Sequence, residues 1–403
     1  MPGPAHIGPI DPQTRLRSVD AVRGFALFGV LLVNMYNFGA YAPEWTGQFD
    51  RAFSALMHAV FETKSWRLFS MLFGFGFALQ LARAASRADG SLWFYFRRLL
   101  ILFGFGMVHA LFYDGDILME YAALGLILVV FRNVRGRVLL VLACVLLAAF
   151  PVGNLFHTET ADEVADRLED QLPLAERRED HPYLDSPMVI FEENSYAIPP
   201  RIWSKLHAPE SSLALFSMFL LGLYVGKARI LHDPAPHLPM IRQVFKWGIG
   251  IGVVSALGEW MLKQNYDYAV FQQSAAPDGV RFIGDLLFAY GSTALALGYG
   301  AGIVLLSRLP AWQLALRPLQ NLGRMALTVY LLGTVMFTTL FYGYGFGQLF
   351  LLGPTATTLY AVFFFTLQLL FCTWWLGRYR FGPFEWLWRS LTYMKAQPLR
   401  LET

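Results

Sequence analysis

The sequence predicts an all-α fold, a polytopic integral membrane bundle of about ten transmembrane helices, forming a single domain over 1–403 with both termini cytoplasmic. Three observations predict this class. Of the 403 residues, 56% are hydrophobic and only 15% are charged, whereas a soluble domain carries about 25% charged residues. The mean hydropathy is +0.43. The apolar residues fall in blocks of about 20, the length at which a helix crosses ~30 Å of hydrocarbon.

Each apolar block defines one expected span. The ten expected spans cover 22–42, 53–82, 96–113, 115–132, 137–155, 211–227, 243–262, 281–307, 320–342 and 355–377. The second and the eighth are long enough to tilt or to extend beyond the bilayer. The third and the fourth are separated by almost no loop, so the charged stretch HALFYDGDILMEYA at 109–122 lies between two apolar runs.

Lysine and arginine test this count because they concentrate in cytoplasmic turns. Of the 32 basic residues, 22 fall at alternate turns, before the first span or in the tail, which requires an even number of spans. The intervening turns are then extracytoplasmic. We expect 156–210 to form an acidic extracytoplasmic cap or a lid over an outward-facing site, with a short amphipathic helix through Val164, Leu168 and Leu172. We expect the tail, 378–403, to lie along the cytoplasmic interface.

The charged stretch supplies the candidate catalytic residues His109, Asp114, Asp116 and Glu120. His109 precedes Asp114 by one and a half helical turns, so it should lie about 7 Å below the turn. An ionisable group at that depth usually faces the bundle interior or a water-filled cavity. Asp116 and Glu120 are four apart and would share a helix face. A His with a carboxylate suits general-base catalysis, because the acid orients the ring and stabilises its protonated form.

Structural roles and a transport function are alternative interpretations of the same stretch. The two aspartates can form a turn and cap a helix, and His109 can be a neutral group bonded to a neighbouring helix. The same set can also carry protons in a transporter.

The outer half of the predicted bundle holds four candidate substrate-binding residues. Glu62, Lys64 and Arg67 stand within six residues of one another, and they either snorkel to the interface or bind an anionic group. Asn34 lies in the outer half of the first span, where it bonds either a neighbouring helix or a ligand.

Basic side chains at the inner mouth form a candidate site for a phosphate-bearing cofactor. Asp20 and Arg23 can pair at i, i+3 near the start of the first span, and the guanidinium fork of Arg324 suits a phosphate. Arg97 and Arg98 complete the set. The alternatives are a structural ion pair and positive-inside anchoring. The sequence has no Walker A, CxxC or HExxH pattern, so we expect no metal site.

Five stretches carry a family resemblance: SVDAVRGFALFGVLLVNM at 18–35, SWRLFSMLFGFGFALQL at 65–81, HALFYDGDILMEYAALG at 109–125, NLGRMALTVYLL at 321–332 and RFGPFEWLWRSLTY at 380–393. Together they resemble the YeiB-like family of bacterial inner-membrane proteins, whose defining region is a domain of unknown function. The resemblance spans almost the whole chain and implies a multi-pass protein of the bacterial cytoplasmic membrane.

By distant similarity, that family is grouped with transmembrane acyltransferases such as the heparan glucosaminide acetyltransferases. The resemblance implies that acyl-CoA binds from the cytoplasm as a co-substrate and that its acyl group passes through the bundle to an acceptor, with a His as base. Asp20, Arg23 and Gly24 resemble the first-helix motif of that group. In the heparan enzymes the working His follows the first helix, but 42–57 has no His here, so we place the role on His109.

The sequence therefore supports three functional hypotheses. The first is a transmembrane acyltransferase. The second is a proton-coupled small-molecule transporter that uses Glu62, Arg67, His109 and Asp116, and the third is a non-catalytic membrane scaffold. The expected partners are the lipid bilayer and a small-molecule or glycan acceptor, with no nucleic acid, and a homodimer is left open.

Overall fold

The computed structural model of the chain describes residues 16–37, 45, 47–85, 92–156, 174–179, 181–207, 210–266 and 276–401. Within these ranges all regular elements are helices, and the only extended pairing is an isolated bridge between Tyr379 and Arg400. The all-α class is therefore confirmed. The short helix expected through 164–172 lies outside the described residues.

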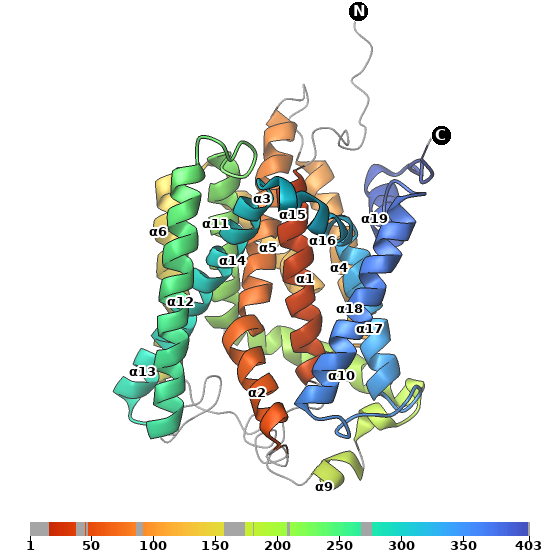
Figure 1. The fold of residues 1–403 in the computed structure, drawn as a ribbon. Helices are drawn as coiled ribbons and strands as arrows, with labels where there is room; N and C mark the ends of the chain where they lie inside the picture. Colours follow the sequence, from red (N-terminus) through yellow and green to blue (C-terminus); the bar gives the residue numbers. More distant parts are fainter. Residues whose placement is uncertain are drawn as a thin grey trace, which may run out of the picture.

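The chain forms the following helices in order: α1 (Arg17–Asn37), α2 (Gln48–Leu56), η2 (Met57–Phe61), α3 (Lys64–Ala85), α4 (Trp93–Ala110), α5 (Leu118–Leu128), η3 (Val129–Asn133), α6 (Gly136–Leu147), α7 (Ala149–Phe156), α9 (Leu174–Glu179), η4 (Pro182–Leu184), α10 (Pro187–His207), α11 (Glu210–Lys227), α12 (Leu238–Tyr266), α13 (Asp278–Leu286), η5 (Leu287–Gly291), α14 (Ser292–Leu306), α15 (Pro310–Ala315), α16 (Arg317–Arg324), α17 (Ala326–Phe341), α18 (Pro354–Leu376) and α19 (Pro383–Tyr393). The turns η2 and η5 are π-helical, and η3 and η4 are 3₁₀. In Figure 1 the long helices run roughly side by side. The start of α1 and α19 lie at one end of the bundle, and α9 and α13 lie at the other.

Five stretches of helix among the described residues are long and apolar enough to cross a membrane. They are Arg17–Asn37, Gly136–Phe156, Leu238–Tyr266, Asp278–Leu306 and Pro354–Leu376, and α16 with α17 forms a sixth if that bent pair is one span. The chain is therefore an all-helical protein with several membrane-spanning candidates. Ten spans, and which end faces the cytoplasm, remain predictions.

Three of the expected spans differ from simple rods. The fourth contains only the 11 residues of α5 as α-helix, which reach about 17 Å and fall short of the ~30 Å of hydrocarbon. The second is broken at Glu62 and Thr63, where Thr63 takes a left-handed backbone with φ of 60° before α3 begins. The ninth begins with α16, which meets α17 at 88°. A hydropathy pattern does not reveal such breaks, because they depend on local backbone conformation and on contacts between distant segments.

Glycines let several of these helices approach to backbone contact. A Cβ on Gly24 of α1 would overlap the carbonyl oxygen of Leu319 in α16, and a Cβ on Gly323 of α16 would overlap the carbonyl oxygen of Asp20. Helices in lipid associate through such close packing, because the apolar solvent supplies no hydrophobic drive between them. The first-helix glycine therefore fixes α1 against α16.

Two helices cover the ends of the bundle. At one end, α10 lies against the link between α4 and α5, and it continues as helix through Pro199 and Pro200. At the other end, α19 begins with Pro383 at its first turn, which suits the fixed φ of proline, and ends at Met394 with a left-handed backbone.

Candidate functional site

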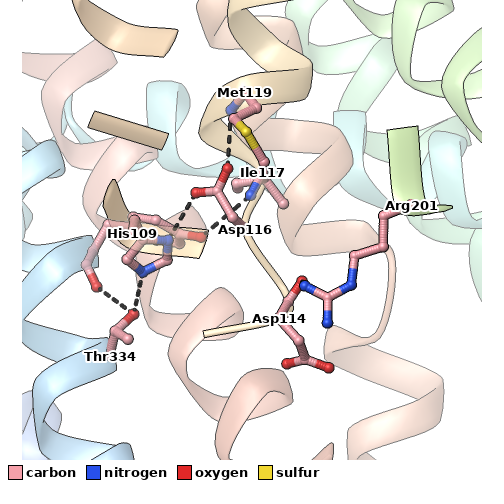
Figure 2. Close-up of polar contacts among 8 residues, drawn as sticks. His109, Asp114, Asp116, Ile117, Met119, Arg201 and Thr334 are labelled. Atoms are coloured by element: carbon pink, nitrogen blue, oxygen red, sulfur yellow. Dashed lines mark hydrogen bonds and ion pairs between the residues drawn. The ribbon is translucent and has the colours of Figure 1, made fainter. Parts of the chain in front are cut away.

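His109 lies in the last turn of α4 with both ring nitrogens occupied. Its side chain is buried, and the residue is 6% exposed. Nδ1 lies 2.7 Å from Oδ1 of Asp116, and Nε2 lies 2.8 Å from Oγ1 of Thr334 on α17 (Figure 2). The three side chains come from the end of α4, the link to α5 and the middle of α17. The site therefore joins parts of the chain that are far apart in sequence.

The link between α4 and α5 holds Asp116 in place. The second oxygen of Asp116, Oδ2, accepts a hydrogen bond of 3.0 Å from the backbone N–H of Met119 in the first turn of α5. A carboxylate in this position satisfies a helix N–H and suits the positive end of the helix dipole. Gly106 leaves the room that this requires, because a Cβ there would lie 2.6 Å from the Met119 nitrogen and 3.0 Å from Oδ2.

These contacts assign the proton on the His109 ring. An ionised carboxylate only accepts hydrogen bonds, so Nδ1 of His109 must donate to Asp116. In the neutral ring Nε2 is then the acceptor, and the Thr334 hydroxyl donates to it. The Thr334 hydroxyl also lies 3.4 Å from the carbonyl oxygen of Tyr330, one turn back on its own helix. It therefore has a second acceptor at hand if another group takes its place at Nε2.

Aromatic rings surround the imidazole. The ring centres of Tyr330 and Tyr113 lie 5.0 Å and 5.6 Å from that of His109, and Phe337 packs against Tyr113 at 4.9 Å. The Tyr330 hydroxyl accepts a bond of 3.4 Å from the backbone N–H of Ile117 and so ties α17 to the link. In such a dry surrounding the His109–Asp116 hydrogen bond is stronger than it would be in water.

Of the four candidate catalytic residues, the structure brings together only His109 and Asp116. Asp114 turns away toward Arg201 of α10, whose Nη1 donates to the Asp114 carbonyl oxygen at 3.1 Å (Figure 2). Glu120 accepts from Lys205 of α10 and from the Ser212 hydroxyl at 2.7 Å. The expected shared face of Asp116 and Glu120 is absent, because α5 begins at Leu118 and Asp116 lies in the link before it.

The contacts of Asp114 and Glu120 make α10 a cover over the link. Asn194 adds a third contact through its Nδ2, which donates to the carbonyl oxygen of Leu111 at 3.3 Å. Residues 187–207 therefore cover this link, and the cap and the lid both stay predictions for 156–210.

Three of the residues at the predicted inner mouth, Asp20, Arg23 and Arg98, make contacts that the structure describes. Nη1 of Arg23 pairs with Asp20 at 2.9 Å and donates to the Gly323 carbonyl oxygen at 3.3 Å. The Arg98 guanidinium lies 3.9 Å from the ring centre of Trp388 in α19. The charges of Arg23 and Arg389 repel that of Arg98, so three guanidinium groups gather here.

Arg97 and Arg324 are the other two basic candidates of this predicted mouth. Arg97, next to Arg98, is half-buried, and its Nε has no hydrogen-bond partner among the described residues. Arg324 ends α16, at the bend into α17.

Glu385 of α19 holds the first turn of α17. It accepts hydrogen bonds from the backbone N–H groups of Leu327 and Thr328, at 2.6 and 3.0 Å, and from the Thr328 hydroxyl at 2.6 Å. Burial raises the pKa of the Glu385 carboxyl. The tail helix therefore docks on α17 as well as on α4.

The candidate substrate-binding residues lie at two places. Lys64 and Arg67 are 4% and 2% exposed, so they point into the bundle and do not snorkel. Glu62 bonds with His58 one turn back. Asn34 is half-buried on α1, and no hydrogen bond joins it to the other described residues.

Several residues of these networks escaped the sequence analysis. Thr334, Arg201 and Trp388 each bond a partner more than 80 residues away, and nothing in their local pattern marks them. Within the described part of the chain, no group of three or more His, Cys, Asp or Glu side chains is arranged to hold a metal ion.

The fold and the site define an all-helical protein with several membrane-spanning candidates and a buried His–carboxylate pair. The family model for a protein of unknown function (DUF418) matches residues 225–395. The uncharacterized protein YxaH of Bacillus subtilis (strain 168) is 30% identical over 96% of this chain and 97% of its own length. The uncharacterized protein YeiB of Escherichia coli (strain K12) is 30% identical over 94% and 97%. The chain therefore belongs to the YeiB-like family. No solved structure matches the chain.

Proposed function

We propose that the chain is a transmembrane acyltransferase, which moves an acyl group from cytoplasmic acyl-CoA to a hydroxyl or amine acceptor on the far side of the membrane. The observation that carries the proposal is the buried His109, held by Asp116 at Nδ1 and covered only by a hydroxyl at Nε2. That hydroxyl occupies the position that an acceptor hydroxyl must take to be deprotonated.

His109 acts as the general base in this proposal. The acceptor O–H displaces the Thr334 hydroxyl, which turns to the Tyr330 carbonyl, and donates to Nε2. As the acceptor oxygen forms a bond with the thioester carbonyl carbon, its proton moves to Nε2, and the C–S bond then breaks with the electron pair leaving on the CoA sulfur. Asp116 stabilises the positive charge that the ring gains, and such a base contributes roughly 10²–10⁴-fold to the rate.

The guanidinium groups at the opposite end of α4 would hold the CoA phosphates. Arg23, Arg98 and Arg389 lie close enough for mutual repulsion, which an anion would relieve. Arg98 precedes His109 by 11 residues on α4, so about 17 Å of helix separates the two sites, and the thioester arm would have to span this length.

Binding of acyl-CoA is the first test. The detergent-purified protein should melt at a higher temperature with acetyl-CoA or a longer acyl-CoA, because a ligand at 100 times its Kd stabilises the folded state by ~2.7 kcal/mol. The shift should be lost in Arg98→Gln and kept in Arg308→Gln, which alters an exposed arginine. The absence of a shift with every acyl-CoA would contradict the proposal.

A proton-coupled transporter is the second candidate, and the buried charges of Lys64 and Arg67 in α3 favour it. Ionisable groups inside a helical membrane bundle commonly mark a substrate or ion pathway. Solute flux into proteoliposomes that contain no CoA would support this function, and flux would have to fall in Arg67→Gln.

A further inference from the structure

The two π-helical turns found in the described part of the chain, η2 and η5, both contact the start of α3. Lys64 Nζ donates to the carbonyl oxygen of His58 in η2 at 2.8 Å. Arg67 Nη1 donates to carbonyl oxygens of η5, those of Ala289 and, at 3.4 Å, Phe288. A π-helical turn interrupts the regular helical hydrogen-bond ladder, which leaves carbonyl oxygens for side-chain donors, and such turns frequently occur at functional sites.

A third contact joins η2 to α14, the helix that follows η5. The hydroxyl of Tyr299, on α14, donates to the carbonyl oxygen of Val60 in η2 at 3.1 Å. Thr63, between η2 and α3, has a left-handed backbone, which is uncommon for a β-branched residue and marks local strain. The turns, the strained residue and the two buried cations therefore belong to one region.

Arg67 uses only one of its nitrogens in these contacts. All three of its hydrogen bonds leave from Nη1, the third reaching the Thr293 hydroxyl at 2.8 Å. Its Nε is buried and has no hydrogen-bond partner among the described residues. The rings of Trp66 and Phe288 flank the guanidinium, each with its centre 5.5 Å from Cζ. The Nε edge, which can bind a carboxylate with two parallel bonds, is thus left unused in a dry surrounding.

No carboxylate forms an ion pair with Arg67 among the described residues. Lys64 and Arg67 are the two buried cations, Glu62 and Glu259 are half-buried acids near them, and Lys263 is exposed. Glu62 is engaged with His58. Glu259 of α12 feels the three cations, yet no ion pair within the described residues joins it to Lys64 or Arg67. Arg67 is therefore a buried charge that forms no ion pair with the other described residues, and such a charge is costly.

We infer that Arg67 and Lys64 form an internal binding site for a carboxylate, with the acid held on the Nε edge of Arg67. A carboxylate fits the planar guanidinium fork and brings one negative charge near Glu62 and Glu259, whereas a dianionic phosphate would bring two. The inference does not depend on acyl transfer, because the site shares no contact with the His109–Asp116 pair. It names carboxylic acids as the class of small molecule that enters the bundle near η2 and η5.

The test measures the melting temperature of the full chain in detergent at pH 7.5. Potassium acetate, propionate or inorganic phosphate replaces potassium chloride at constant ionic strength, so that only a specific site gives a saturable rise. We expect acetate and propionate to stabilise the wild type and phosphate to add nothing. Arg67→Lys keeps the charge but loses the forked edge, and it should raise the half-saturating concentration roughly tenfold or more.

Two further variants keep the test decisive. Arg178→Gln is the matched control, because Arg178 also bonds backbone carbonyl oxygens, those of Gly347 and Leu349, and it should leave the carboxylate effect unchanged. Lys64→Gln should weaken the effect even if changes at Arg67 prevent folding. No saturable effect in the wild type, a larger effect of phosphate, or a full effect in both Arg67→Lys and Lys64→Gln would overturn the inference.

Discussion

Both ring nitrogens of His109 form hydrogen bonds, and the two partners have different roles. Asp116 accepts from Nδ1 through one oxygen and from the Met119 N–H through the other, so both of its oxygens are engaged. Thr334 occupies Nε2 but can return to its own helix carbonyl. The fixed side of the ring is thus the orienting side, and the exchangeable side is the reactive one.

The first prediction concerns the charge of Asp116. Asp116→Asn keeps an oxygen for the Met119 N–H, so the link should fold and the melting temperature should change little. The amide can no longer stabilise a protonated ring, and acyl transfer should fall by roughly 10²-fold or more. Rates and melting curves of the same preparations check this. Unchanged transfer would remove Asp116 from the mechanism.

The local sequence pattern identified His109 and Asp116, because both are ionisable residues among apolar neighbours. The predicted pairing of Asp116 with Glu120 was wrong. The i, i+4 rule holds only within one helix, and α5 starts between these two residues. The local pattern failed for Thr334, because a threonine in an apolar helix is unremarkable until the fold brings it to a ring 225 residues away.

At the scale of elements, close helix contact depends on a few glycines. Gly24→Ala should destabilise the protein by about 1–3 kcal/mol, because the new Cβ meets the rigid backbone of α16. Gly76→Ala is the matched control in α3, where a Cβ would meet nothing within 4 Å, and its better helix propensity should keep or raise stability. Thermal unfolding in detergent compares the two. Equal effects would show that α1 and α16 do not need this contact.

A second element, the segment from α9 to η4, docks on the chain between α17 and α18. Arg178 donates to the carbonyl oxygens of Gly347 and Leu349, and the rings of His181 and Phe350 lie 5.4 Å apart. Burial, with a smaller effect from Arg177, lowers the pKa of His181 to about 4. Its Nδ1 accepts from the Tyr183 N–H, which a protonated ring could not do.

Docking of this segment should therefore depend on pH. Because the folded pKa lies below the ordinary value of about 6.5, the contribution is full at neutral pH and is lost as pH falls from about 6.5 through about 4. Proteolysis of the segment should accelerate at pH 4.5 relative to pH 7, with an acid-stable protease and a reference substrate for each pH. His181→Gln should flatten the dependence, and an equal pH response in that variant would exclude His181 as its cause.

For the whole molecule, hydropathy and the distribution of charged residues predicted the all-helical class well. A bilayer requires every spanning segment to be apolar and to satisfy its own backbone hydrogen bonds, so this signal recurs in each helix. Hydropathy and charge could not predict the break at Thr63, the bend before α17 or the short α5, because these depend on hydrogen bonds and contacts between distant segments. The same holds for α10, whose covering role follows from Asn194, Arg201 and Lys205.

The molecule thus has two buried polar centres, one at His109 and one at Arg67, in a frame closed at its ends by α10 and α19. The first centre offers a base, and the second offers an unused guanidinium edge. Acyl transfer requires the His109 centre, and carboxylate binding requires only the Arg67 centre. Variants at the two centres can therefore be compared for acyl transfer and for carboxylate binding in the same protein.

The most direct measurement is transfer of a radiolabelled acyl group from acyl-CoA in membrane vesicles that contain the protein, where acceptors are present. Wild type should transfer label from at least one of acetyl-, butyryl- and palmitoyl-CoA. His232→Gln, which alters an exposed histidine, should match it, and His109→Gln should transfer at least roughly 10²-fold less while still binding acyl-CoA. Equal transfer by His109→Gln, or no transfer above vesicles without the protein, would contradict a His109-based acyltransferase.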